Sequence, residues 1–485
     1  MNNNIQGNEV RCFKMRSKNI HMIIIVFLLL GMNIPCVSAV IPPVIQWQKS
    51  LGGSSTDQAQ SIVISREGGY AVAGWSQSSD GDVSGNHGSG DFWVVRLDAS
   101  GNILWQKSLG GSGMDVAQSV QQTSDNGYIV AGATWSNDGD VSGNHGNGDY
   151  WVVKLDSGGN LQWQKTFGGS GIDNAFSVNI THDGNYIVAG WTQSNGGDVT
   201  GYHGGADFWI VKLDPVGNIL WERSLGGSEA EHAWASFETI DGGFIIAGDS
   251  KSNDGDVTGN HGNEDYWVVK LDPDGNPQWQ KSLGGSNQDA ARAIHQTDDG
   301  GYVVTGWSNS NDGDVTGNHG DEDYWVVKLD PSGNIEWQKS LGGLSQERAK
   351  CIQYIPTAQG VFVLAGFTRS PDGDVTGNHG NEDYWVVELD PSGNLQWQKS
   401  LGGSSHEEAT SVQQDPHGGW IIAGSANSND GDVTGNHGNE DFWVVKLSPE
   451  NPITPTPTTS PFSPVAVVSA MMIIGIYSVI TKKRI

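Results

Sequence analysis

The residues best suited to chemistry are the carboxylates of the segment DGDVTGNHGNED, residues 254–265. Its Asp and Asn oxygens could converge on one hard cation, and calcium prefers such ligands. The segment is not an EF-hand loop, because it lacks that ligand spacing and the final Glu. The alternative is that these side chains cap turns by accepting hydrogen bonds from nearby backbone N–H groups. Over all copies of the segment, the predicted calcium ligands are Asp80, Asp82, Asp91, Asp138, Asp140, Asp149, Asp254, Asp256, Asn260, Asp265, Asp312, Asp314, Asp323, Asp372, Asp374, Asp383, Asp430, Asp432 and Asp441.

Each copy of this segment also contains one histidine. A zinc site would need several histidines within a few ångströms of each other, yet each lies in a different copy. A histidine that is hydrogen-bonded within its own loop is therefore favoured over a zinc ligand. The seven are His87, His145, His203, His261, His319, His379 and His437.

Less regular aromatic residues are candidates for ligand binding. Aromatic rings beside carboxylates and amides suit sugars, because a ring can pack on the apolar face of a sugar. The alternative is that the rings belong to the core. The predicted ligand-binding residues are Trp75, Trp135, Trp191, Trp307, His232 and Trp234.

Motifs of catalysis are missing from the sequence. It contains no nucleophile elbow, phosphate-binding loop, HExxH or CxxC. Glycoside hydrolysis needs one asymmetric pair of carboxylates, not seven similar copies. The sequence therefore predicts a protein that is not an enzyme.

A repeat positions all these residues. The tryptophans of the WQKSLGG-type segments, from Trp47 to Trp397, are spaced by 58 residues five times and then by 60. Such a period indicates a repeat architecture. Within the first complete unit we expect four short antiparallel strands, at residues 61–65, 70–75, 91–97 and 103–109.

Four strands per unit predict an all-β fold, a seven-bladed β-propeller with four-stranded antiparallel blades. The chain opens with a lone strand at residues 44–51 and ends with a set of three. We expect this first strand to complete the last blade, which leaves no unpaired edge. An open solenoid is the alternative. In the ring, all the long Asp-rich loops would gather on one face.

Two segments carry a resemblance to known proteins. LDPSGNIEWQKSLGG (329–343) and TDDGGYVVTGWSNSNDGDVTGNHG (297–320) resemble tandem propeller repeats of uncharacterised exported surface proteins of archaea and bacteria. The resemblance covers residues 44–447 and implies a seven-bladed surface propeller with no established activity. The LDxxGNxxxW part is also similar to the tryptophan-docking segment of quinoprotein propellers, whose cofactor residues have no counterpart that can be placed here.

The two ends of the chain predict export and anchoring. Residues 1–39 read as a signal peptide, with basic residues before an apolar run at 23–30 and a small-residue cleavage site. An uncleaved anchor helix is the alternative. Residues 40–450 are the predicted propeller and 451–461 a Thr/Pro-rich linker. Residues 462–485 are predicted to be a transmembrane helix with a basic end or a sorting tail. This tail resembles the C-terminal sorting tails of archaeal surface proteins, which a sortase-like enzyme removes, and a permanent membrane anchor is the alternative with the same orientation.

Charge and cysteine content limit the partners. The chain has 55 Asp and Glu against 26 Lys and Arg, a net charge of -29, which argues against nucleic acid. Cys351 is the only cysteine after the leader, so no disulfide partner is expected. No cofactor other than calcium is predicted.

These features together predict a binding, adhesion or surface-organisation module that is exported and anchored at the cell surface. The expected partners are a surface glycan or protein, and the membrane through the C-terminal helix. The alternative is an extracellular carbohydrate-active or quinoprotein-like enzyme that uses the central channel.

Overall fold

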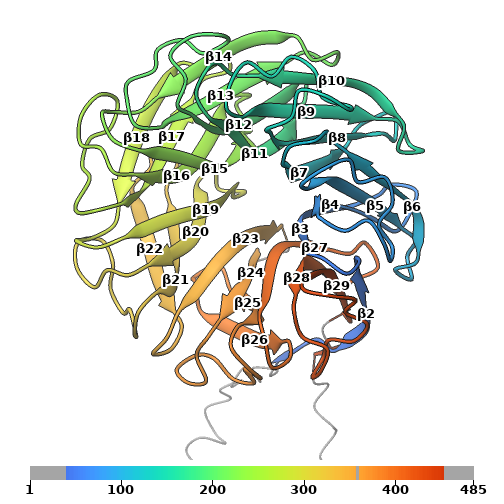
Figure 1. The fold of residues 1–485 in the computed structure, drawn as a ribbon. Helices are drawn as coiled ribbons and strands as arrows, with labels where there is room; N and C mark the ends of the chain where they lie inside the picture. The colour runs from blue at the N-terminus through green and yellow to red at the C-terminus, as the bar shows by residue number, and fades with distance from the viewer. Residues whose placement is uncertain (1–39, 357–359, 450, 453–485) are drawn as a thin grey trace, which may run out of the picture. The chain divides into compact units, whose positions relative to one another are not determined.

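The computed structural model describes residues 40–356, 360–449 and 451–452, and residues 41–451 form one compact unit. This unit contains seven four-stranded antiparallel sheets arranged around a central opening (Figure 1). The prediction of a seven-bladed propeller is confirmed. We number the blades 1 to 7 in the order of their first strands.

In each blade the first strand lies at the central opening and the fourth at the periphery (Figure 1). The first strands are β3 (Asp57–Ile64), β7 (Asp115–Gln122), β11 (Asp173–Ile180), β15 (Glu231–Glu238), β19 (Asp289–Gln296), β23 (Glu347–Ile355) and β27 (Glu407–Gln414). The second strands are β4 (Tyr70–Ser76), β8 (Tyr128–Thr134), β12 (Tyr186–Thr192), β16 (Phe244–Ser250), β20 (Tyr302–Ser308), β24 (Val361–Thr368) and β28 (Trp420–Ala426). The third strands are β5 (Asp91–Leu97), β9 (Asp149–Leu155), β13 (Asp207–Leu213), β17 (Asp265–Leu271), β21 (Asp323–Leu329), β25 (Asp383–Leu389) and β29 (Asp441–Leu447). The fourth strands are β6 (Ile103–Leu109), β10 (Leu161–Phe167), β14 (Ile219–Leu225), β18 (Pro277–Leu283), β22 (Ile335–Leu341), β26 (Leu395–Leu401) and β2 (Ile45–Leu51). Two further short strands, β1 (Val40–Ile41) and β30 (Asn451–Pro452), pair with each other.

The amino-acid pattern of each strand matches its depth in the blade. The third strand β17, DYWVVKL, is buried at every position, as a strand covered on both faces must be. The fourth strand β18, PQWQKSL, is exposed at its first two positions and buried at its last two. Aromatic and β-branched residues thus concentrate where the pleated surface is buried.

The ring closes by strand exchange between the two ends of the unit. β2 pairs antiparallel with β29, from Ile45 opposite Leu447 to Leu51 opposite Phe442. The backbone N–H of Ser448 also donates to the carbonyl oxygen of Val44, at 2.8 Å. The predicted closure is confirmed, and the open solenoid is wrong.

Neighbouring blades pack through aromatic residues of the third strands. The rings of Tyr266 in blade 4 and Trp325 in blade 5 lie 4.6 Å apart, and the Tyr266 hydroxyl donates to the Trp325 carbonyl oxygen. Trp325 is completely buried, and truncating such a residue to Ala costs about 3–5 kcal/mol. The hydrophobic clusters lie between adjacent blades and consist of residues from 44–447. This segment therefore has a hydrophobic core of its own, which a domain requires to fold alone.

The predicted leader (1–39) and most of the predicted linker and tail (453–485) lie outside the described residues. Within the parts of the chain that the structure describes, no helix is long and apolar enough to cross a membrane.

Candidate functional site

In six of the seven acidic loops, the first Asp connects this loop to a second one by a hydrogen bond. Asp254 Oδ1 accepts the backbone N–H of Ser228, at 2.8 Å, from the connection that leads into the same blade. This hydrogen bond holds the pKa of Asp254 below its usual range, although the side chain is exposed. Blade 3, which has Gly196 at this position, lacks the bond. Asp80, Asp138, Asp312, Asp372 and Asp430 make the same contact with Ser54, Ser112, Ser286, Leu344 and Ser404.

The next two polar positions also act within the loop. The backbone N–H of Asp256 donates to the carbonyl oxygen of Gly226, and its carboxylate lies 3.2 Å from the Gly226 nitrogen. Asn260 donates from its amide to the carbonyl oxygen of Ser250 and accepts from the backbone of Gly262. The backbone of the equivalent second Asp makes the same contact in Asp82, Asp140, Asp198, Asp314, Asp374 and Asp432.

The last Asp of the loop begins the third strand and is completely buried. Asp265 accepts hydrogen bonds from the backbone N–H and the Nδ1 of His261, at 2.8 and 2.7 Å, so the histidine is bound within its own loop. Burial raises the pKa of Asp265 to about 6, although the His261 hydrogen bonds oppose the shift. The same His–Asp pair is formed by Asp91, Asp149, Asp207, Asp323, Asp383 and Asp441.

A second buried carboxylate lies beside each of these aspartates. A Cβ placed on Gly284 would come within 2.8 Å of oxygens of both Asp265 and Asp289, so the bare backbone of this glycine separates the two side chains. The Oδ1 of Asp265 has no hydrogen-bond partner. Among residues 40–356, 360–449 and 451–452, no three His, Cys, Asp or Glu side chains form a group able to hold a metal ion. The hydrogen bonds of the loops thus favour the turn-capping alternative, and a calcium titration decides between the two.

The central channel is lined by one extra residue from every blade. In β3 the pairing with β4 skips Gln60, because Ala59 lies opposite Gly74 and Ser61 opposite Ala73. A Cβ on Gly74 would lie 1.9 Å from the Gln58 carbonyl oxygen, so only glycine permits this close approach. Such a bulge directs an unpaired side chain away from the sheet. We call the seven bulge residues the channel residues: Gln60, Gln118, Phe176, Trp234, Arg292, Lys350 and Thr410.

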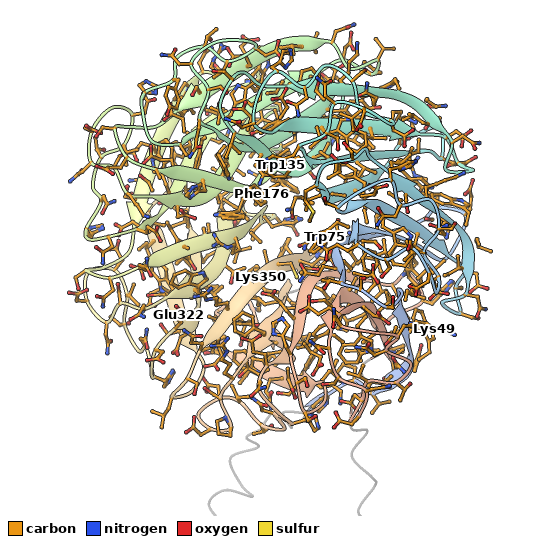
Figure 2. The ribbon with its side chains drawn as sticks, in the orientation of Figure 1. Lys49, Trp75, Trp135, Phe176, Glu322 and Lys350 are labelled. Carbon is orange, nitrogen blue, oxygen red and sulfur yellow. The ribbon has the colours of Figure 1, made fainter. Side chains whose placement is uncertain are left out.

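The channel residues differ from blade to blade, whereas the residue before each of them is always Ala. Together with Glu408 they line a cavity of about 330 Å³. Two neighbouring members are aromatic, the next two are cationic, and the other three carry amides or a hydroxyl. Figure 2 shows Phe176 and Lys350 beside the central opening, with Trp75 and Trp135 nearby. The cavity is therefore chemically asymmetric within a nearly sevenfold fold.

Asp249 organises the aromatic side of the cavity. It takes the position in β16 where blades 1, 3 and 5 have a tryptophan. Its carboxylate accepts from His232 Nδ1 at 2.9 Å, Trp234 Nε1 at 2.5 Å and the Arg292 guanidinium at 3.1 Å. Burial alone would raise the pKa of Asp249, but the hydrogen bond from His232 and the charge of Arg292 outweigh it and lower the pKa. Asp249 is therefore a buried anion that fixes three side chains.

Trp234 is held between two other channel residues. The Arg292 guanidinium carbon lies 3.9 Å from the Trp234 ring centroid, and the Phe176 ring lies 4.2 Å from it. On blade 6, which follows the blade of Arg292, Lys350 forms an ion pair with Glu408 at 2.8 Å. Phe176, Trp234, Arg292 and Lys350 thus form a continuous wall of two rings and two cations.

The structure separates the six predicted ligand-binding residues. Only Trp234 lines the cavity, whereas His232 contacts Asp249 beside it and packs edge-on against Trp191. Trp307 is buried under the Arg348 guanidinium. Trp135 is 38% exposed. Trp75 is partly exposed near the C-terminal end of β4 and does not line the cavity.

Sequence reasoning missed six of the seven channel residues: Gln60, Gln118, Phe176, Arg292, Lys350 and Thr410. The strand of blade 1 was expected at residues 61–65, but β3 begins at Asp57, which places Gln60 within it. The polar sequence DQAQ resembles a loop, yet Gln60 lies within β3 and its side chain lines the cavity. One signal in the sequence could have identified the channel residues. In every repeat they directly follow an invariant Ala, and they occupy a position that varies from repeat to repeat.

Comparisons with known proteins are limited to the fold. No family model matches the sequence. "Regulatory protein FlaEY" of Caulobacter vibrioides is 25% identical over 224 residues, which cover 43% of this chain and 23% of that protein. Hydrazine synthase of Kuenenia stuttgartiensis aligns at 12% identity with a TM-score of 0.49, over 77% of this chain and 94% of that one. The Pan2 WD40 domain of Neurospora crassa aligns at 12% identity with a TM-score of 0.44, over 83% and 96%. Alignments of this identity and TM-score assign no ligand or activity to the chain.

Proposed function

We propose that the protein is a non-enzymatic binding module of the cell surface, whose glycan or protein partner enters the central channel from the loop face. The observation that carries this proposal is the contrast between two sets of positions. The loop carboxylates repeat from blade to blade and are engaged in hydrogen bonds within the fold. The channel residues depart from the repeat and converge on one cavity.

The ends of the chain support placement at the surface. The leader-like residues 1–39 direct the chain out of the cytoplasm, and the apolar segment 462–480 with its basic end retains it at the membrane. The Thr/Pro-rich linker, residues 451–461, separates this apolar segment from the propeller in the sequence, and segments of this composition act as extended spacers. These features favour adhesion or surface organisation over a freely diffusing protein.

The test is binding by the propeller, residues 40–452, to an array of glycans and to purified cell-envelope proteins. Saturable binding is expected, and Phe176→Leu should weaken it while Lys107→Gln on the outer strand β6 should not. Equal loss in both variants, or no binding to any member of either set, would overturn the proposal.

An enzyme is the second candidate because of one observation, the pair formed by Asp249 and His232. An anionic acceptor at Nδ1 leaves the His232 Nε2 as a proton acceptor, the arrangement of a general base. The side chain of His232 is 27% exposed. Turnover of a glycan that is lost in His232→Gln, without a change in glycan binding, would establish this candidate instead.

A further inference from the structure

We propose that the cavity formed by the channel residues selects a carboxylate-bearing sugar unit, a hexuronate or a close relative. This inference rests on the proposed binding function and names the ligand class of the same site. It follows from three walls of different chemistry, which face each other across about 330 Å³. That volume is at the lower end for ligand pockets and suits one sugar unit rather than a chain.

The cationic wall supplies the contact for the carboxylate. Arg292 and Lys350 occupy the same bulge position on neighbouring strands. One nitrogen of Arg292 bonds Asp249, while the ring of Trp234 supports the guanidinium plane. The guanidinium is thereby held in one orientation and keeps further N–H donors, and Lys350 keeps two beyond its bond to Glu408. In a chain of net charge -29, this pair gives an anion a charge-assisted contact inside the ring.

The amide wall supplies partners for hydroxyl groups. The side chains of Gln60 and Gln118 are half-buried, line the cavity and make no hydrogen bond within the described chain. Each amide offers both a donor and an acceptor, which is what a sugar hydroxyl requires. The Thr410 hydroxyl instead donates to backbone carbonyl oxygens of its own and the next blade. The two glutamines are therefore the unsatisfied polar groups of the cavity.

The aromatic wall supplies a surface for the apolar face of the sugar. Phe176 stands between Trp234 and Gln118 in the order of the blades. Its contact with Trp234 is fixed at 4.2 Å, and it is half-buried, so part of its ring faces the cavity. An aromatic ring, a pair of cations and two free amides together match a ring that carries both hydroxyls and a carboxylate.

The test is calorimetric titration of residues 40–452 with three small ligands: glucuronate, glucose, which lacks the carboxylate, and cyclohexanecarboxylate, which lacks the hydroxyls. Glucuronate should bind tightest. Lys350→Gln should weaken glucuronate binding by about tenfold or more and leave glucose unchanged, because it removes a hydrogen bond to a charged group. Gln118→Leu should weaken both sugars without affecting cyclohexanecarboxylate.

Lys49→Gln is the matched control, because Lys49 lies on the outer strand β2, far from the opening (Figure 2). Thermal midpoints of all variants separate lost binding from lost folding. Equal binding of glucose and glucuronate with no effect of Lys350→Gln overturns the carboxylate, and equal binding of cyclohexanecarboxylate overturns the sugar. If none of the three binds, the inference fails, whereas the glycan and protein arrays still decide the proposed function independently.

Discussion

Replacing Asp249 should be among the most damaging single changes in the channel. In Asp249→Ala the Arg292 guanidinium, His232 and Trp234 lose their common acceptor. The Asp249 and Arg292 side chains are 5% and 17% exposed, so solvent replaces little of the lost contact. Removing one partner of a buried ion pair costs about 3–5 kcal/mol, since the other charge stays buried. With an unfolding entropy of about 2.1 cal/mol/K per residue over roughly 410 residues, the thermal midpoint should fall by about 4–6 °C.

Two further variants separate charge from shape. Asp249→Asn keeps an oxygen for Trp234 but removes the charge that faces Arg292, so we expect a loss of about 2 kcal/mol. Asp274→Ala, at the exposed turn of the same blade, should change the stability by less than about 0.5 kcal/mol. The measurement is thermal and urea unfolding followed by circular dichroism.

The double variant Asp249→Ala with Arg292→Met tests the cause. It should be more stable than Asp249→Ala alone, because it leaves no unpaired buried guanidinium. A wild-type midpoint for Asp249→Ala, or no recovery in the double variant, would refute the reasoning that Asp249 stabilises the channel as a counter-ion.

Three other predictions concern pH, calcium and closure. Asp265 and Asp323 have folded pKa values of about 6, above the unfolded value near 3.8, so the stability they contribute is fully present below pH 4 and is lost as the pH rises through 6. Each should change the unfolding free energy by up to about 1.4 kcal/mol per pH unit within that window, and the thermal midpoint should be higher at pH 5 than at pH 7.5. Asp265→Asn should flatten this dependence, and a midpoint that rises toward pH 7.5 would contradict the assignment. After chelation, a calorimetric calcium titration should show no saturable sites, because the first Asp of the acidic loops, such as Asp254, already accepts a backbone N–H. Saturable heat that is reduced by Asp256→Ala would instead establish that the loops bind metal. Deleting residues 40–51 should expose the edge of β29 and cause aggregation, which light scattering measures. A peptide of residues 42–53 added in trans should reverse the aggregation. A deletion variant that stays monomeric with an unchanged thermal midpoint would show that closure is dispensable.

The fold could be predicted because its signals are repeated seven times. Strands such as Asp91–Leu97 contain a continuous apolar run, Phe92 to Val95, and the spacing of the tryptophans predicted the number of blades. Closure followed from the lone strand at the beginning, without any knowledge of side-chain contacts. What the spacing could not show was the start of the innermost strands, where polar residues face an open channel and resemble a loop.

The candidate site was predicted only in part, for the same physical reason. The abundant carboxylates predicted a metal site in the acidic loops. In the structure, these carboxylates accept hydrogen bonds that stabilise the loops. His232 and Trp234 were identified as departures from the repeat, but their connection to Arg292 depends on Asp249, which lies seventeen residues away from His232 on the neighbouring strand. A contact of this kind follows from strand register, and the bulge after Ala233 shifts that register by one residue.

The exchange of strands in blade 7 has a consequence for the order of synthesis. Its outer strand β2 is made first, while its three inner strands, ending with β29, are made last. Six blades can be completed as the chain emerges, but during that time β2 has no partner. A chain still attached to the ribosome therefore carries one strand without its hydrogen-bonding partner, and Leu51 lacks its neighbour Phe442, until residue 447 has emerged. Ring closure is the last folding event of this protein, and a chain truncated in any earlier blade has no way to reach it.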